Sequence, residues 1–181
     1  MNTQLSPSPE DLSIMAMRHF NKKDYKNASD LFLKALDGFK KNNDEIMVAE
    51  TKNNLSVAFL LLGDSQAALD YAQGTDTIFK EFNDNKRQAM ALGNQAAAYE
   101  ALNRIPEAIE RYKQSSEILM DSDENELRSY LLKNLSTLQL KHGQQLEAVA
   151  TMQAAMNSKK KLSLKEKVLK KLLDTPFRLM R

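Results

Sequence analysis

At 181 residues the chain has the size of one ordinary domain, so it can bury a continuous core and needs no metal, disulfide or partner merely to fold. The absence of cysteine excludes disulfide frameworks, thiolate nucleophiles and cysteine-ligated zinc. The net charge of +2 is uneven: residues 157–181 hold nine Lys or Arg against two acidic residues, a local charge of +7, while residues 1–156 carry −5.

The first nine residues, 1–9, are predicted to be disordered. They contain neither a positively charged leader nor an apolar segment. No run along the chain approaches the roughly 18 apolar residues that a membrane span requires. We therefore expect a cytoplasmic protein.

A period of 40 residues organises most of the remaining chain. Good helix formers dominate the whole sequence, which contains only five glycines and four prolines, so an all-α fold is expected. Four alanines open apolar helical stripes at this interval: Ala28, Ala68, Ala108 and Ala148. Twelve positions before each stands a small residue: Ala16, Ser56, Ala96 and Ser136. Small residues at both places let two antiparallel helices approach closely, so each period is predicted to form one helical hairpin.

The four predicted hairpins follow one another with short connections. In chain order they occupy residues 10–40, 44–82, 84–120 and 123–158. Between them, Asn43-Asp44, Asn83-Asp84 and Asp121-Ser122-Asp123 supply helix N-cap signals. Within the hairpins, turns are predicted five positions before each alanine, where three of the four residues tolerate a left-handed backbone: Lys23, Gly63, Asn103 and Gly143.

The last predicted element is a basic amphipathic helix at 161–175, followed by a flexible tail at 176–181. Its apolar stripe consists of Leu164, Val168, Leu169, Leu172 and Leu173. Because an end repeat otherwise exposes its core face, this helix is predicted to cap the last hairpin.

These residues resemble the tetratricopeptide repeat family, in which a leucine, a small residue and an aromatic precede the alanine. The length of 40 and the runs Asn54-Leu55-Ser56 and Asn134-Leu135-Ser136 are similar to the extended repeats of kinesin light chains. The resemblance implies a right-handed α-solenoid of four hairpins plus the capping helix. The proline that usually closes each repeat is absent, so the second helix of each hairpin is expected to run on without a break. HEAT-type repeats share the length, but this sequence lacks the regular intrahelical proline that kinks their first helix.

The sequence supports no catalytic, cofactor or metal site. Its two histidines, His19 and His142, lie three repeats apart, and His19 occupies a position otherwise taken by bulky residues. The acidic run at 121–126 begins like a calcium loop but lacks the glycine at position six and the glutamate at position twelve. We therefore expect a non-enzymatic protein without cofactor or metal.

In the family that the chain resembles, the first helix of each hairpin lines a concave groove. Three asparagines recur there at intervals of 40, and an amide offers both a donor and an acceptor to the backbone of an extended peptide. The alternative is that these asparagines make contacts within the hairpins. The predicted peptide-binding groove consists of Met17, Asn53, Asn54, Val57, Leu61, Met90, Asn94, Ala97, Tyr130, Lys133, Asn134, Thr137 and Lys141.

The predicted function is that of an adaptor, scaffold or assembly factor that binds a peptide segment in this groove, with a regulatory peptide sensor as the alternative. The apolar groove floor favours a partner with apolar anchors, and Lys133 and Lys141 favour acidic groups. The basic C-terminal region leaves three possibilities open. Its helix could cap the last hairpin with solvated lysines, or it could contact an anionic membrane or acidic partner. Alternatively, its apolar end could occupy the groove of the same chain or of a second copy, which would give self-inhibition or an oligomer; this end consists of Pro176, Phe177, Leu179 and Met180. Nucleic-acid binding is not expected, because no aromatic residues interleave the lysines.

Overall fold

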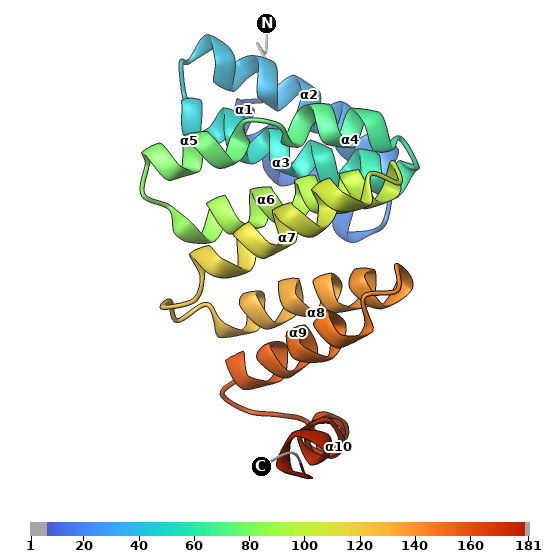
Figure 1. Ribbon diagram of the computed structural model, residues 1–181. Helices are drawn as coiled ribbons and strands as arrows, with labels where there is room; N and C mark the ends of the chain where they lie inside the picture. The colour runs from blue at the N-terminus through green and yellow to red at the C-terminus, as the bar shows by residue number, and fades with distance from the viewer. Residues whose placement is uncertain (1–6, 180–181) are drawn as a thin grey trace, which may run out of the picture. The chain divides into compact units, whose positions relative to one another are not determined.

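The computed structural model describes residues 7–179, and their side chains as far as Leu173; within this range it consists of α-helices joined by short turns, without a strand (Figure 1). The predicted all-α helical repeat is confirmed. The chain divides into two compact units, residues 1–103 and 104–181, which are treated separately below. The right-handed sense of the solenoid stays a prediction.

Unit 1 contains two hairpins and the first helix of a third. Its helices are α1 (Pro9–Asn21), α2 (Tyr25–Lys41), α3 (Glu45–Leu62), α4 (Ser65–Ala72), α5 (Thr75–Glu81) and α6 (Asn85–Ala101). Unit 2 contains α7 (Ile105–Ile118), α8 (Asn125–Lys141), α9 (Gln145–Ser158) and α10 (Leu164–Leu179). The helix α10 therefore includes residues 176–179 of the predicted flexible tail, and residues 1–6 and 180–181 lie outside the described range.

One type of corner joins the helices of unit 1. A residue with left-handed backbone ends each corner, and the aspartate that follows it caps the next helix, its carboxylate accepting from the backbone N–H three positions on. The pairs are Lys23-Asp24, Asn43-Asp44, Gly63-Asp64 and Asn83-Asp84. The corner thus recurs every 20 residues, both within hairpins and between them. In unit 2 the helices α7, α8 and α9 have no side-chain cap hydrogen bond.

The small residues of the 40-residue period all lie in the interior, as the hairpin prediction requires. The four alanines and the small residues twelve positions before them are buried. In unit 1, Ala16 and Ala28 belong to one cluster with Phe32, Leu36 and Leu55. In unit 2, the hydroxyl of Ser136 donates to the carbonyl of Ala148 at 2.7 Å, so these two residues hold α8 against α9 directly.

The second helix of the second hairpin is interrupted, which corrects the expectation that it runs on. Gly74 adopts a left-handed backbone with φ of 77° and separates α4 from α5. The carbonyl of Ala72 is freed by this break, and it accepts from the Thr75 hydroxyl at 2.7 Å and from the Gln95 amide at 3.1 Å. A backbone that loses its helical partner must find another one when buried, so Thr75 and Gln95 stabilise the break.

Candidate functional site

Apart from Asn53, the predicted groove residues of unit 1 are exposed or half-buried on α1, α3 and α6, and we call the surface that they form the open face. Met17, Leu61 and Met90 are its exposed apolar residues. Asn54, Val57, Asn94 and Ala97 lie between them and are half-buried. Exposed methionines and leucines beside half-buried amides combine apolar contact area with hydrogen-bonding groups, as peptide-binding surfaces require.

A hollow of about 260 Å³ lies on the open face between α1 and α3. Ile14 and Met17 line it from α1, and Met47, Glu50 and Asn54 line it from α3. The buried hydroxyl oxygen of Ser13 also borders the hollow and has no hydrogen-bond partner. Its walls are therefore mostly apolar, with a few polar groups at fixed positions, which is the usual composition of a small binding pocket.

The asparagines that recur at intervals of 40 have side-chain donors and acceptors that make no hydrogen bond with the described residues. Within the described residues, the side chains of Asn54, Asn94 and Asn134 make no hydrogen bond, and all three are half-buried. The sequence left open whether these amides make contacts within the hairpins. No such hydrogen bond is present in the part of the chain that the structure describes, so their donors and acceptors face solvent and are accessible to a ligand.

Asn53 corrects the predicted groove. It is buried, and its side-chain oxygen lies 3.0 Å from the Thr75 hydroxyl, on the side of α3 that packs against α5. Adjacent positions on a helix point about 100° apart, so Asn53 and Asn54 cannot both line one face. Asn53 is a structural residue at the break between α4 and α5.

An ion-pair network fixes α6 against α3 at the edge of the open face. Arg87 pairs with Glu50 of α3 at 2.8 Å and with Asp84, the cap of its own helix, at 2.6 Å. Its guanidinium also lies 5.4 Å from the centre of the Phe79 ring. The backbone N–H of Arg87 donates to Asp84 and holds the pKa of that carboxyl below its usual value. The network places Glu50, which borders the hollow, at a fixed position.

The lowered pKa of Asp84 predicts a dependence of stability on pH. Because the pKa is depressed in the folded state, the stabilisation is complete above the unfolded value of 3.8 and is lost as the pH falls through the folded value. Asp84→Asn is therefore expected to cost about 0.5–1 kcal/mol at neutral pH, and its unfolding curve should converge with that of the natural sequence in acid. Urea titrations at several pH values measure this difference.

The control for this prediction is Asp30→Asn, which replaces an exposed carboxylate that accepts no hydrogen bond from the described residues. A difference between Asp84→Asn and the natural sequence that stayed constant down to the lowest pH would contradict the assignment.

In unit 2, the predicted groove residues lie on α8. Tyr130, Thr137 and Lys141 are exposed, and Asn134 is half-buried. Lys133 departs from its predicted role, because its ammonium pairs with Glu166 of α10 at 2.6 Å. The acidic group that Lys133 was expected to attract from a partner is therefore supplied by the chain itself.

A second hollow, of about 370 Å³, was missed by sequence reasoning. It lies in unit 1 at the break between α4 and α5, where Gly74, Thr75 and Ile78 face Val48 and Lys52 of α3. The 40-residue repeat predicted one unbroken helix in place of α4 and α5, and Gly74 was the only residue that indicated a break. Charged and polar side chains line the hollow beside apolar ones: Lys40, Asn43, Glu45, Lys52, Gln73 and Thr75 with Val48, Ala49 and Ile78.

The described residues contain no cluster of metal-ligating side chains. No three His, Asp or Glu side chains among them gather in an arrangement that could hold a metal ion. His19 is half-buried, and its Nδ1 lies 2.8 Å from Asp24, which also accepts from Asn27 at 2.7 Å. This pair belongs to the corner between α1 and α2.

No protein-family model and no curated protein matches the sequence. Solved structures do match. BtubC from P. vanneervenii is similar over 90% of this chain and 73% of its own, with a TM-score of 0.75 and 18% identity. The nearly identical TPR-like repeats of a putative kinesin light chain from Podosopora anserina are similar over 82% of this chain and 73% of theirs, with a TM-score of 0.71 and 19% identity.

The fold is a tetratricopeptide-like helical repeat. Aspartyl phosphate phosphatase F from Bacillus subtilis shares it with a TM-score of 0.79 and 14% identity, over 92% of this chain but only 44% of that protein. The predicted resemblance to kinesin light chain repeats is thus confirmed for the fold. In this tetratricopeptide-like fold, no helix within residues 7–179 is long and apolar enough to cross a membrane.

Proposed function

We propose that the protein is a non-catalytic interaction module that binds an extended peptide segment on the open face of unit 1. The observation that carries this proposal is the pair of half-buried amides, Asn54 and Asn94, that have no hydrogen bond within the described residues and lie among exposed apolar side chains. An extended backbone presents N–H and C=O groups whatever its sequence, so the amides supply affinity. The tetratricopeptide-like fold supports the proposal, because its stacked first helices present a continuous surface to a partner.

Specificity would come from the hollow between α1 and α3. Ile14, Met17 and Met47 supply an adaptable apolar lining, which suits a single apolar anchor side chain of the peptide. Glu50, which also lines the hollow, is paired with Arg87, and Glu10 of α1 adds an exposed carboxylate that has no ion pair among the described residues. The pairing of Lys133 with Glu166 removes one of the two lysines that favoured acidic groups. We therefore propose a peptide with an apolar anchor, and no net charge is required of it.

The test begins with peptides selected from a displayed random library against the full chain. Calorimetry then compares the natural sequence with Asn54→Ala/Asn94→Ala. Each lost hydrogen bond costs about 1 kcal/mol, so the dissociation constant is expected to rise about 30-fold. The melting temperature should change little, because the amides have no hydrogen bond to lose within the described residues.

The matched control is Asn42→Ala/Asn85→Ala, which removes two exposed amides of unit 1 that lie off the open face. Methyl NMR supplies an independent map: the peptide should shift the methionine methyl signals of Met17 and Met90 and leave that of Met120, an exposed residue of unit 2, unchanged. Equal affinity of both double variants, or methyl shifts confined to Met120, would exclude binding on the open face.

A further inference from the structure

The helix α10 contacts the rest of unit 2 through its polar side. The carboxylate of Glu166 lies 2.6 Å from the ammonium of Lys133 on α8 and 3.2 Å from that of Lys159. At Leu173, the last residue whose side chain is described, the backbone carbonyl accepts from the Gln153 amide of α9 at 3.0 Å. Hydrogen bonds and ion pairs, not the apolar stripe, thus fix the orientation of α10.

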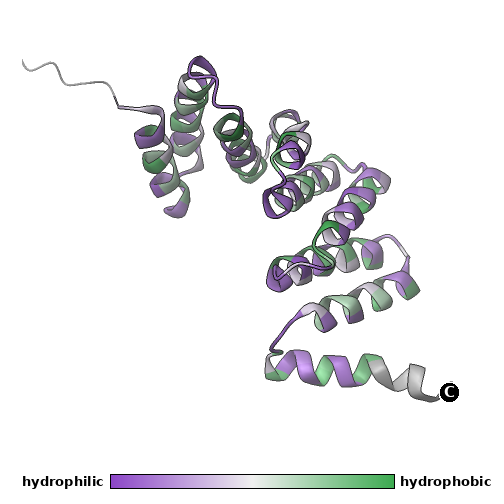
Figure 2. Cartoon of the chain, turned by 90° about the vertical axis from the view of Figure 1, so that its left-hand side faces the viewer, coloured by the Kyte–Doolittle hydropathy of each residue, from purple (hydrophilic) through white to green (hydrophobic). Residues whose placement is uncertain are grey.

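Part of the predicted apolar stripe of α10 faces solvent, whereas Leu173 at its end is half-buried. Leu164, Val168 and Leu172 are spaced four residues apart and are 80%, 56% and 65% exposed. Leu169 beside them is 39% exposed. Figure 2 shows the hydrophobic and hydrophilic segments alternating along this helix. A soluble surface seldom leaves three aliphatic residues aligned and uncovered, so the stripe indicates a contact with another apolar phase.

Positive charge surrounds the stripe. Lys165 and Lys167 are exposed on α10, and Lys161 is exposed directly before it. Glu166 is the single acidic residue between 159 and 173, and both of its oxygens are engaged, since the Ser163 N–H donates to the second one at 2.8 Å. The hydrogen bond from Lys133 holds the pKa of Glu166 far below its usual range, so this charge stays paired and turned inward. Within residues 164–173, the exposed side of α10 therefore carries only positive charge.

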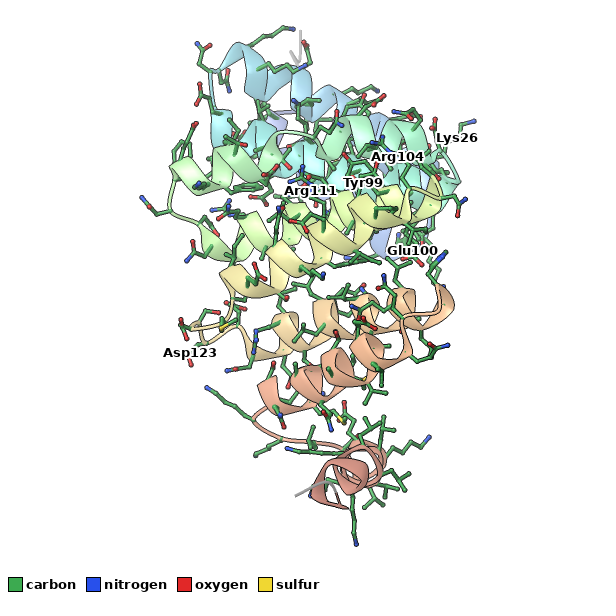
Figure 3. The ribbon with its side chains drawn as sticks, viewed as in Figure 1. Lys26, Tyr99, Glu100, Arg104, Arg111 and Asp123 are labelled. Atoms are coloured by element: carbon green, nitrogen blue, oxygen red, sulfur yellow. The ribbon has the colours of Figure 1, made fainter. Side chains whose placement is uncertain are left out.

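The segment that leads into α10 is also held in place. Lys160 pairs with Asp123, on the turn before α8, at 3.2 Å, and the label of Asp123 marks this turn in Figure 3. Lys159 pairs with Glu126 of α8 at 3.3 Å as well as with Glu166. The connection between α9 and α10 thus contacts α8 and the turn that precedes it.

We propose that α10 is an interfacial helix that inserts the Leu164, Val168 and Leu172 stripe into the headgroup region of an anionic membrane and thereby attaches the protein to its surface. An apolar stripe flanked by lysines is the pattern of helices that lie in the plane of a membrane interface. Lysines on such a helix bury their aliphatic stems while their ammonium groups contact anionic headgroups. A second copy of the chain suits the stripe less well, because the lysines of two α10 helices would face each other.

Vesicle co-sedimentation of the full chain tests this proposal. Vesicles of phosphatidylcholine alone are compared with vesicles in which phosphatidylserine replaces part of that lipid. Binding is expected to be at least about tenfold stronger to the anionic vesicles and to weaken as salt is raised. Leu164→Gln/Val168→Gln/Leu172→Gln should lower the partition coefficient at least about tenfold, because the apolar contact is lost. Lys165→Gln/Lys167→Gln should lower it about tenfold as well.

The matched control replaces three equally exposed apolar residues of unit 2 that lie outside α10, in the variant Met120→Gln/Leu140→Gln/Leu146→Gln. Glutamine is a good helix former, so circular dichroism should show unchanged helicity in every variant. Equal binding of the stripe variant and the natural sequence would overturn the proposal, since the lysines alone would then suffice. Light scattering that showed a dimer through α10 without pelleting on anionic vesicles would also overturn it.

Discussion

Replacing Phe32 with alanine is expected to lower the free energy of unfolding by about 3–5 kcal/mol. Phe32 is 1% exposed and packs in one cluster with Ala16, Ala28, Leu36 and Leu55, so its ring fills the space between α1, α2 and α3. Truncation removes the transfer free energy of the ring and leaves a cavity that close-packed helices cannot fill. Because Phe32 also borders the hollow between α1 and α3, the same change should weaken peptide binding.

The matched control is Phe82→Ala, which removes the same ring from an exposed position at the end of α5 in the same unit. It is expected to change the unfolding free energy by less than about 0.5 kcal/mol. Urea unfolding followed by circular dichroism gives both values. Similar losses for the two variants would show that the cluster around Phe32 is not the core of unit 1.

Ala68→Leu is expected to destabilise unit 1 by about 1–3 kcal/mol through overpacking. Ala68 on α4 is fully buried, and the small residue twelve positions earlier, Ser56 on α3, is buried as well. A leucine at this place adds three carbon atoms where two helix backbones approach most closely, so the helices must separate or the side chain must adopt a strained rotamer. Thermal unfolding and hydrogen exchange of α3 and α4 measure the loss.

Ala101→Leu, at an exposed position near the end of α6, adds the same atoms without the close approach and serves as the control. It should leave stability within about 0.5 kcal/mol of the natural value. If Ala68→Leu were tolerated equally well, the small-residue contact would not define the hairpin.

The fold could be predicted from the sequence because it depends on a small residue at each close contact between two helices, and this requirement recurs along the chain. A close helix–helix contact tolerates only small side chains, and Ala28, Ala68, Ala108 and Ala148 reveal it at a constant interval. The asparagines of the open face follow from the same register, since position on a helix determines the face. Their lack of hydrogen bonds within the described residues could not be predicted, because it depends on what the neighbouring helices leave uncovered.

The features that the sequence did not predict depend on contacts between elements far apart in the chain. Gly74 could have indicated the break between α4 and α5, but the break is stabilised by Gln95 of α6, 23 residues after the carbonyl that it contacts. Asn53 was predicted to line the groove, but it lies in the interior, where it contacts Thr75. The orientation of α10 follows from Lys133 and Glu166, which lie 33 residues apart. The hydrophobic pattern of the sequence had instead predicted that the apolar side of α10 packs against the last hairpin.

The corner of unit 1 has a consequence for how such a chain can change in length. The corners lie 20 residues apart, at Lys23, Asn43, Gly63 and Asn83. The smallest piece that can be inserted or deleted without disrupting a corner is therefore one helix with its corner. Adding one such piece before α6 would turn α6 from the first helix of a hairpin into the second, so Asn94 would no longer share a surface with Asn54. Only an even number of inserted pieces keeps the later helices on their original faces. The number of pieces therefore limits the possible chain lengths more strictly than helix geometry does.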